Sequence, residues 1–332
     1  MKPHRFILPV LLGLILSGAA MAADADFRAK YRRPSAVPAP ADNQPNPARV
    51  KLGQMLFFDP RLSGNGAISC ASCHNPALAW GDRLPLGRGD GHKLLGRRTP
   101  TVLNAAFNEV QMWDGRFATL EEQALGPMLS KDEMNITADE ILVRLKAIPG
   151  YAPLFQAAYG DEGITTVTLA KAIASFERTI ISGEAPFDRF VEGEDQALSP
   201  AARRGFALFN TKANCASCHS GWAFSDSSFH DIGIVSDDLG RGKTLDLPAL
   251  NHTFKTPNLR NITERAPYMH NGSESNLQQV IELYNQGGRV KRGTLSSDIK
   301  PLNLTSEEVS DLVAFLHSLS SKDTPVTIAA LP

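Results

Sequence analysis

The chain has 332 residues, enough for two ordinary domains, and an apolar share of 42%, which is typical of a soluble protein with sizeable cores. Its formal net charge of −1 gives no electrostatic argument for binding nucleic acid. A basic start, a short apolar run and the small residues of "SGAAMA" predict that residues 1–22 are a secretory signal peptide. The run is shorter than the ~20 apolar residues of a membrane anchor, and no later run comes close. We therefore expect a periplasmic protein without a membrane span after signal cleavage.

Helical patterns follow a Pro-rich arm at 34–47. Capping boxes predict that helices begin after Thr137 and Thr305, and Ser199 followed by a proline predicts another start. Apolar residues at spacings of four, three and four run along 169–180 as one helical stripe. No long alternating pattern predicts a strand, so we expect a mainly α fold.

Two copies of the pentapeptide "CASCH" contain all four cysteines of the chain. Disulfides are the ordinary use of cysteine in an exported protein, but each copy matches the C-x-x-C-H motif that attaches a c-type haem. Two thiols reach the two vinyl groups of one porphyrin, and the adjacent histidine becomes the proximal iron ligand. A zinc ribbon is the competing interpretation, but its cysteine pairs lie about 15–20 residues apart, whereas 142 positions separate Cys73 from Cys215. The predicted haem residues are Cys70, Cys73, His74, Cys215, Cys218 and His219.

A longer passage also occurs twice, with an offset of 157 positions. Two differences between the copies stand out: Trp113 corresponds to His270, and Pro127 corresponds to Tyr284. The repeat predicts two haem domains related by internal duplication, each built like a c-type cytochrome. The residues that recur unchanged are Thr99, Pro100, Asn104, Met112, Gly115 and Leu120, which return as Thr256, Pro257, Asn261, Met269, Gly272 and Leu277.

The order and spacing of four motifs, "LGQMLFFDPRLSGNGAISCASCH", "TPTVLNAAFNEVQMWDGR", "GFALFNTKANCASCHSGWAF" and "TPNLRNITERAPYMHNG", resemble the bacterial dihaem cytochrome c peroxidase and MauG family. The resemblance covers nearly the whole chain after the signal peptide. It implies an N-terminal peroxidatic haem domain at 23–185 and a C-terminal second-haem, electron-transfer domain at 186–332. It also implies that one haem reacts with hydrogen peroxide while the other relays or stores electrons.

The resemblance also concerns the ligand of the second haem. Ordinary peroxidases of the family use a Met fourteen residues after the His of a Y-x-H-x-G motif, whereas MauG-like members use a Tyr followed by N-x-G-G. Here the position fourteen residues after His270 is Tyr284, followed by "NQGG". A phenolate is hard and anionic and favours oxidised iron, whereas a thioether favours ferrous iron. The alternative is a core tyrosine on the predicted helix "NLQQVIELYN".

Pro127 cannot ligate iron, so we expect the first haem to keep an open sixth position. The resemblance places Gln123 and Glu133 in the distal pocket, where a carboxylate beside an amide suits proton transfer during O–O cleavage. The alternative is that both side chains are simply solvated. Trp113 falls where the family keeps a Trp between the two haems, which makes it a hopping station for electrons or an aromatic packed at the interface.

Two departures limit the resemblance. Where ordinary peroxidases carry a distal His, the closest alignment has Arg88, with His92 nearby; we expect an open first haem, with His92 ligation as the alternative. The Asn that supplies a calcium ligand in the family is replaced by Arg98. The carbonyls of Arg265 and Pro267 remain candidate calcium ligands, but a cationic side chain at this place disfavours calcium.

These patterns predict a hydrogen-peroxide-dependent dihaem oxidoreductase. Peroxide would be reduced at the N-terminal haem, and the His/Tyr haem would share the oxidising equivalents in a MauG-like high-valent state to oxidise a protein or redox-protein partner. Two alternatives stay open: an ordinary cytochrome c peroxidase with a small cytochrome or cupredoxin donor, and a dihaem electron carrier without chemistry of its own. The sequence names neither the partner nor the oligomeric state, monomer or homodimer.

Overall fold

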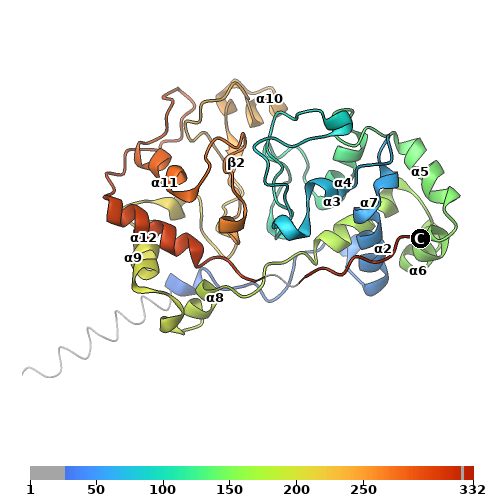
Figure 1. Cartoon of the computed structure of the whole chain (residues 1–332), viewed down its shortest axis with the longest axis horizontal. Helices are drawn as coiled ribbons and strands as arrows, with labels where there is room; N and C mark the ends of the chain where they lie inside the picture. Colours follow the sequence, from blue (N-terminus) through green and yellow to red (C-terminus); the bar gives the residue numbers. More distant parts are fainter. Residues whose placement is uncertain (1–26, 323–324) are drawn as a thin grey trace, which may run out of the picture.

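The structure is a computed structural model that describes residues 27–322 and 325–332, so the predicted signal peptide lies outside the described residues. Helices dominate two lobes, with the first half of the chain on the right of Figure 1 and the second half on the left. The α-helices are α2 (Pro47–Phe58), α3 (Cys70–Cys73), α4 (Leu120–Leu129), α5 (Ala138–Ala147), α6 (Tyr151–Tyr159), α7 (Thr166–Glu177), α8 (Pro186–Val191), α9 (Pro200–Asn210), α10 (Arg241–Leu245), α11 (Leu277–Asn285) and α12 (Ser306–His317).

The predicted helix starts are confirmed by their caps. Thr137 and Thr305 each accept a hydrogen bond from the backbone three residues on, and each belongs to a complete capping box. Ser199 accepts from the Ala202 amide at the start of α9. The described strands are two residues long, β1 (Phe229–His230) and β2 (Phe254–Lys255), and they pair antiparallel. The prediction of a mainly α fold is therefore confirmed.

Each half is built around the same crossing of two helices. α2 packs against α7 in the first half, and α9 packs against α12 in the second. A glycine permits the close approach in both places, because a Cβ on Gly53 would lie 1.9 Å from the Ala172 carbonyl oxygen and one on Gly205 would lie 2.0 Å from the Asp311 carbonyl oxygen. The internal repeat of the sequence is thus accompanied by the same helix–helix packing in both halves.

Two apolar cores correspond to the two halves. Phe57 and Phe176 lie at the helix crossing of the first core, with ring centroids 5.3 Å apart. Phe206 and Phe315 occupy the crossing of the second core, also 5.3 Å apart. Each core packs against the first cysteine of its own "CASCH" motif, so the motifs are anchored on rigid scaffolds.

The ends of the chain are exchanged between the two cores. Phe27 and Tyr31, near the start of the described chain, pack with the second core, and the Tyr31 hydroxyl donates to Asn210 Oδ1 at 2.6 Å. Val326 and Ala329, near the C-terminus, pack against the first core. Figure 1 shows the C-terminus beside α2 and α6. The N-terminal segment therefore covers part of the second half, and the C-terminal segment covers part of the first half.

The two halves meet through a reciprocal pair of backbone contacts. The Arg98 amide donates to the His270 carbonyl oxygen at 2.7 Å, and the Lys255 amide donates to the Trp113 carbonyl oxygen at 2.8 Å. Residues 98 and 255 correspond in the repeat, as do 113 and 270. The interface therefore follows an approximate two-fold relation, and Trp113 lies within it.

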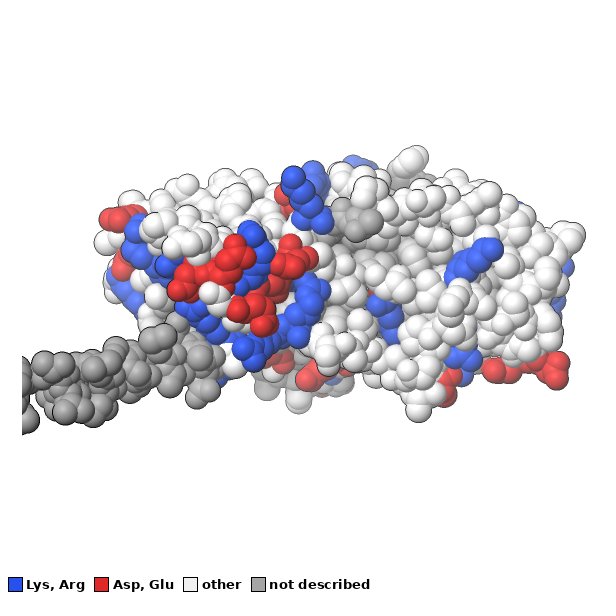
Figure 2. All heavy atoms as spheres, turned by 90° about the horizontal axis from the view of Figure 1, so that it is seen from below, with Lys and Arg blue, Asp and Glu red and all other residues white. Residues whose placement is uncertain are grey.

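The face drawn in Figure 2 carries its charged side chains mainly over the second half, where acidic and basic residues are mixed. Ion pairs that involve the second half include Arg28 with Asp195 and Arg189 with Glu194. Mixed signs give this face no single potential to steer a charged partner. No helix in the described part of the chain is long and apolar enough to span a bilayer.

Candidate functional site

A cavity of about 1210 Å³ is lined by both halves of the molecule. It exceeds the ~300–1,000 Å³ of most small-molecule sites. Pro267 and His92 do not line it. The predicted site residues that line it are Cys70, Cys73, His74, Arg88, Trp113, Gln123, Pro127, Glu133, Cys215, Cys218, His219, Arg265 and Tyr284.

The first attachment motif places a neutral imidazole against this cavity. α3 carries the two cysteines, and His74 follows directly as its C-cap. The His74 ring nitrogen Nδ1 lies 3.2 Å from the Trp80 carbonyl oxygen. A carbonyl oxygen only accepts, so Nδ1 carries the proton and Nε2 keeps its lone pair. Burial lowers the pKa of His74, which keeps the ring neutral and able to bind a metal.

The second motif repeats this arrangement. His219 Nδ1 lies 2.8 Å from the Phe224 carbonyl oxygen, and burial lowers the pKa of His219 as well. None of the four cysteines forms a disulfide within the described residues. Each half thus supplies two thiols and a neutral histidine whose second ring nitrogen is tied to a carbonyl, the usual setting of a metal-bound imidazole. This donor set fits one c-type haem in each half.

Three predicted distal residues of the first half reach the cavity together. Gln123 and Pro127 lie four residues apart on α4 and therefore share one face of the helix. Glu133 approaches from the turn that follows, where its amide donates to the Ser130 carbonyl oxygen at 3.1 Å. Burial raises the pKa of Glu133, and the Arg116 guanidinium opposes the shift. A proline, an amide and a carboxyl group are thus present on the same side of the cavity as the first motif.

Tyr284 lies in the last turn of α11 and lines the cavity beside Ile281. Burial raises its pKa, and the nearby thiols of Cys215 and Cys218 raise it further, which places the phenol next to the second motif. Because the Tyr284 side chain lines the cavity next to the second motif, its hydroxyl oxygen is a candidate ligand. Ligation of iron by Tyr284, rather than a packing role in the core, stays a prediction.

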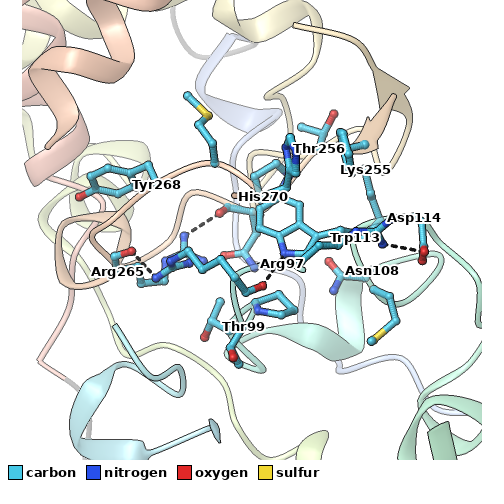
Figure 3. Close-up of a pocket in the computed structure, with 18 of the residues that line it drawn as sticks. Arg97, Thr99, Asn108, Trp113, Asp114, Lys255, Thr256, Arg265, Tyr268 and His270 are labelled. Carbon is cyan, nitrogen blue, oxygen red and sulfur yellow. Dashed lines mark hydrogen bonds and ion pairs between the residues drawn. The ribbon is translucent and has the colours of Figure 1, made fainter. Parts of the chain in front are cut away.

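Trp113 is held between the two halves (Figure 3). Its indole Nε1 donates to the Arg98 carbonyl oxygen at 2.8 Å, and its own carbonyl oxygen accepts from the Lys255 amide. Both contacts fix the ring at the junction of the repeats. The position agrees with the expected aromatic between two haems, and transfer of electrons through it stays a prediction.

The predicted calcium position holds a buried arginine. Arg98 Nη2 donates to the Arg265 carbonyl oxygen at 2.5 Å, which is one of the two candidate calcium ligands. Burial lowers the pKa of both guanidinium groups, and the charge of Arg98 lowers the pKa of Arg265 further. A carbonyl that already accepts from a cation is a poorer calcium ligand. Calcium binding stays an untested prediction that this contact disfavours.

The loop before the first repeat presents Arg88, and not His92, to the cavity. His92 is exposed, and its carbonyl oxygen accepts from Arg88 Nη1 at 3.3 Å. This arrangement supports the expectation of a first haem without a histidine on its distal side.

Glu177 and Lys255 are among the lining residues that the sequence analysis did not single out. Glu177 is 3% exposed, burial raises its pKa to about 8, and its Oε2 atom finds no hydrogen-bond partner among the described residues. Lys255 is 8% exposed. The 157-residue offset pairs Lys255 with Arg98, so the repeat contained a signal for it. Glu177 has no partner at the 157-residue offset of the repeat, and its burial depends on packing between segments that are distant in the sequence.

Two cytochrome c-like lobes with one attachment motif each, sharing one cavity, define a dihaem c-type cytochrome. Comparisons with known proteins agree with this class. A family model described as "Di-haem cytochrome c peroxidase" matches residues 47–196, and a "Cytochrome c" model matches residues 202–320.

Full-length relatives define the family. The methylamine utilization protein MauG of Methylorubrum extorquens is 48% identical, over 95% of this chain and 92% of that protein. Cytochrome c551 peroxidase of Pseudomonas aeruginosa is 34% identical, over 98% of this chain and 95% of that protein. The crystal structure of a MauG-like protein associated with microbial copper homeostasis matches with a TM-score of 0.81 and 30% identity, over 87% of this chain and 95% of that chain. The chain belongs to the di-haem cytochrome c peroxidase and MauG family and is a peroxide-dependent dihaem oxidoreductase.

Proposed function

We propose that this protein reduces hydrogen peroxide in the periplasm at its N-terminal haem, and that a His/Tyr haem in the second half shares the oxidising equivalents to oxidise a protein or redox-protein partner. The observation that carries the proposal is the contrast between Pro127 and Tyr284. Both line the cavity at corresponding positions of the repeat, and only Tyr284 offers a ligand atom. One haem would therefore stay open to peroxide while the other is closed by a phenol oxygen.

The bound haems would supply redox-active iron, held by His74 in the first half and by His219 with Tyr284 in the second. Peroxide reduction consumes two electrons and two protons and releases two waters. Glu133 suits the proton steps, because a carboxyl group can accept and return a proton, and burial raises the pKa of this one. Its carboxylate oxygen would take the proton of one peroxide oxygen and return it to the other, which leaves as water. The Gln123 amide, on the same side of the cavity, would orient the peroxide by hydrogen bonding.

The electrons must cross from one half to the other. Trp113 lines the cavity at the junction, and its N–H is held by the Arg98 carbonyl oxygen at 2.8 Å. A carbonyl oxygen is a very weak base, so an oxidised indole would keep its proton and return to the starting state when it regains an electron. Tyr284 would favour the oxidised state of the second iron, because an anionic oxygen ligand stabilises the higher charge.

Optical and electron paramagnetic resonance spectra of the ferric holoprotein test the proposal. We expect one high-spin haem, one six-coordinate low-spin haem, and a spectral change with stoichiometric peroxide. Two low-spin haems that ignore peroxide would instead identify an electron carrier. Fast turnover with a reduced small cytochrome or cupredoxin would favour the ordinary peroxidase, whereas a long-lived oxidised state with slow turnover would favour oxidation of a protein partner.

A further inference from the structure

A buried lysine without a charged partner lines the cavity between the two halves. Lys255 ends β2 and is 8% exposed. Its backbone is fixed, since its amide donates to the Trp113 carbonyl oxygen and it pairs with Phe229 of β1. Among the described residues, no carboxylate forms an ion pair with the Lys255 ammonium, and burial alone lowers its pKa to about 8. Burial of a charge in this way is unfavourable unless an anion accompanies it.

Two acidic side chains that line the cavity, Asp114 and Asp238, are already engaged by other cations. Arg97 binds Asp114 and Asp238, at 2.6 Å in each case. Asp114 also pairs with Arg116 at 3.1 Å. Lys255 lies beside Trp113 in Figure 3 without joining this network. Within the part of the chain that the structure describes, Lys255 is therefore a cation at the cavity without an ion-paired carboxylate.

The haem groups themselves carry the missing anions. A c-type haem is attached through its vinyl groups, so both of its propionate carboxylates stay free. We propose that the Lys255 ammonium binds a propionate carboxylate of the second haem at the junction of the two halves and raises the reduction potential of that haem. This inference rests on the proposed placement of one haem in each half.

The chain that follows Lys255 connects it to the second motif. The Thr256 amide donates to the Ser228 carbonyl oxygen at 2.9 Å, and the Leu259 amide donates to the Ala223 carbonyl oxygen at 3.2 Å. Ala223 lies just before Phe224, whose carbonyl oxygen holds the His219 ring. Lys255 therefore belongs to the wall of the second haem site, which is why we assign it to that haem.

A cation at the edge of a haem favours the reduced iron, because reduction adds a negative charge nearby. Neutralising Lys255 should consequently lower the potential of the second haem and leave the first haem nearly unchanged. The charge also counteracts the anionic Tyr284 oxygen, so the two residues would adjust one potential in opposite directions.

The test is a spectroelectrochemical titration of both haems in holoprotein carrying Lys255→Met, Lys255→Gln or Lys255→Arg. We expect the two neutral variants to reduce the equilibrium constant for one-electron reduction of the second haem at least tenfold, which corresponds to about 59 mV. The arginine variant keeps the charge and should stay within threefold of the parent. The resonance Raman bending band of the propionate should shift in the neutral variants.

Lys243 offers a matched control, because it also lines the cavity but is exposed. If Lys255→Met and Lys255→Gln change the potential no more than Lys243→Met does, the inference is overturned. If Lys255→Met fails to incorporate both haems, the glutamine variant decides the question. Peroxide consumption is measured on the same samples: an inert parent protein would contradict the proposed function, while the comparison of potentials would remain valid.

Discussion

α4 of the first half and α11 of the second are corresponding helices that differ at the position where we expect one haem to be open and the other to be closed. Pro127 on α4 carries no ligand atom, whereas Tyr284 on α11 presents a phenol oxygen to the cavity. The surrounding backbone is conserved in detail, since Met112 and Met269 both adopt positive φ, at 72° and 71°. The duplication thus preserved the scaffold while single side chains made the two haem sites unlike.

The second helix of each crossing shows the same kind of difference. Matching Gly53 to Gly205 aligns Phe176 with Phe315, because the β-carbons of these phenylalanines lie beside the two glycines. The next residues are Glu177 and Leu316, and both line the cavity. The first site therefore contains a buried acid where the second contains a leucine. At this position the polar group lies in the half that we expect to meet peroxide.

The largest expected effect comes from Tyr284→Met, which gives the second site a thioether ligand. Axial ligands shift haem potentials over about 0.8 V, so we expect a rise of about 0.3 V, or ~7 kcal/mol for one electron. The peroxide-oxidised state should also decay faster. Redox titration and stopped-flow spectra measure both quantities, with Tyr284→Phe as the variant that removes the ligand without replacing it. Unchanged values would remove Tyr284 from the coordination sphere.

Glu133→Gln tests the acid of the first site. Loss of a general acid–base group slows such a step by about 10²-fold or more, so the rate of reaction with peroxide should fall by at least this factor while both haems stay attached. Asp132→Asn is the control, since Asp132 is an exposed neighbour that pairs with Lys93. Equal rates in the two variants would assign Glu133 no part in proton transfer.

Trp113→Phe addresses the residue that differs from its repeat partner His270 at the interface. The substitution removes the oxidisable indole and its hydrogen bond to Arg98, and that bond contributes about 1 kcal/mol. We expect electron transfer between the two sites after peroxide addition to slow at least about tenfold, a barrier increase of 1.36 kcal/mol. Rapid-mixing spectra follow both haems at once. A normal rate would leave Trp113 with a packing role alone.

The last prediction concerns stability rather than activity: Glu177→Leu makes the first site resemble the second. Burial raises the pKa of Glu177 from 4.5 to about 8, so the folded chain binds this proton more tightly than the unfolded chain. Stability from this group is therefore complete below about pH 4.5 and is lost as the pH rises toward 8. In denaturant titrations between pH 5 and 8, the free energy of unfolding of the leucine variant should fall by at least about 1.4 kcal/mol less than that of the parent protein. The exposed Glu162→Leu should follow the parent, and an unaltered slope in Glu177→Leu would mean that the carboxyl titrates normally.

The sequence was sufficient where short-range chemistry decides the structure. The caps at Thr137, Ser199 and Thr305 depend on neighbours within three residues, and all three form as predicted. Residue spacing was also sufficient to predict the two "CASCH" motifs, the mainly α fold and the internal repeat. The family and its peroxide-dependent chemistry followed from these patterns, and the relatives confirm both.

Other features depend on contacts between distant segments. The burial of Lys255 and Glu177 results from packing between halves and between helices, which no local pattern encodes. The choice between Arg88 and His92 depended on the direction of one loop. The Arg98 side chain reaches the Arg265 carbonyl across 167 positions. The domain limits at 23–185 and 186–332 stay predictions, and the packing of Tyr31 with the second core shows why sequence order alone describes the lobes poorly.

The exchanged ends of the chain also bear on how this gene can change. Tyr31 completes the second core, while Val326 and Ala329 cover the first. A deletion that discarded either copy of the repeat would strip part of the cover from the survivor. Selection for a folded product therefore favours keeping both copies in one gene. Residues such as Pro127 and Tyr284 can then differ between the copies while the two copies are still inherited together.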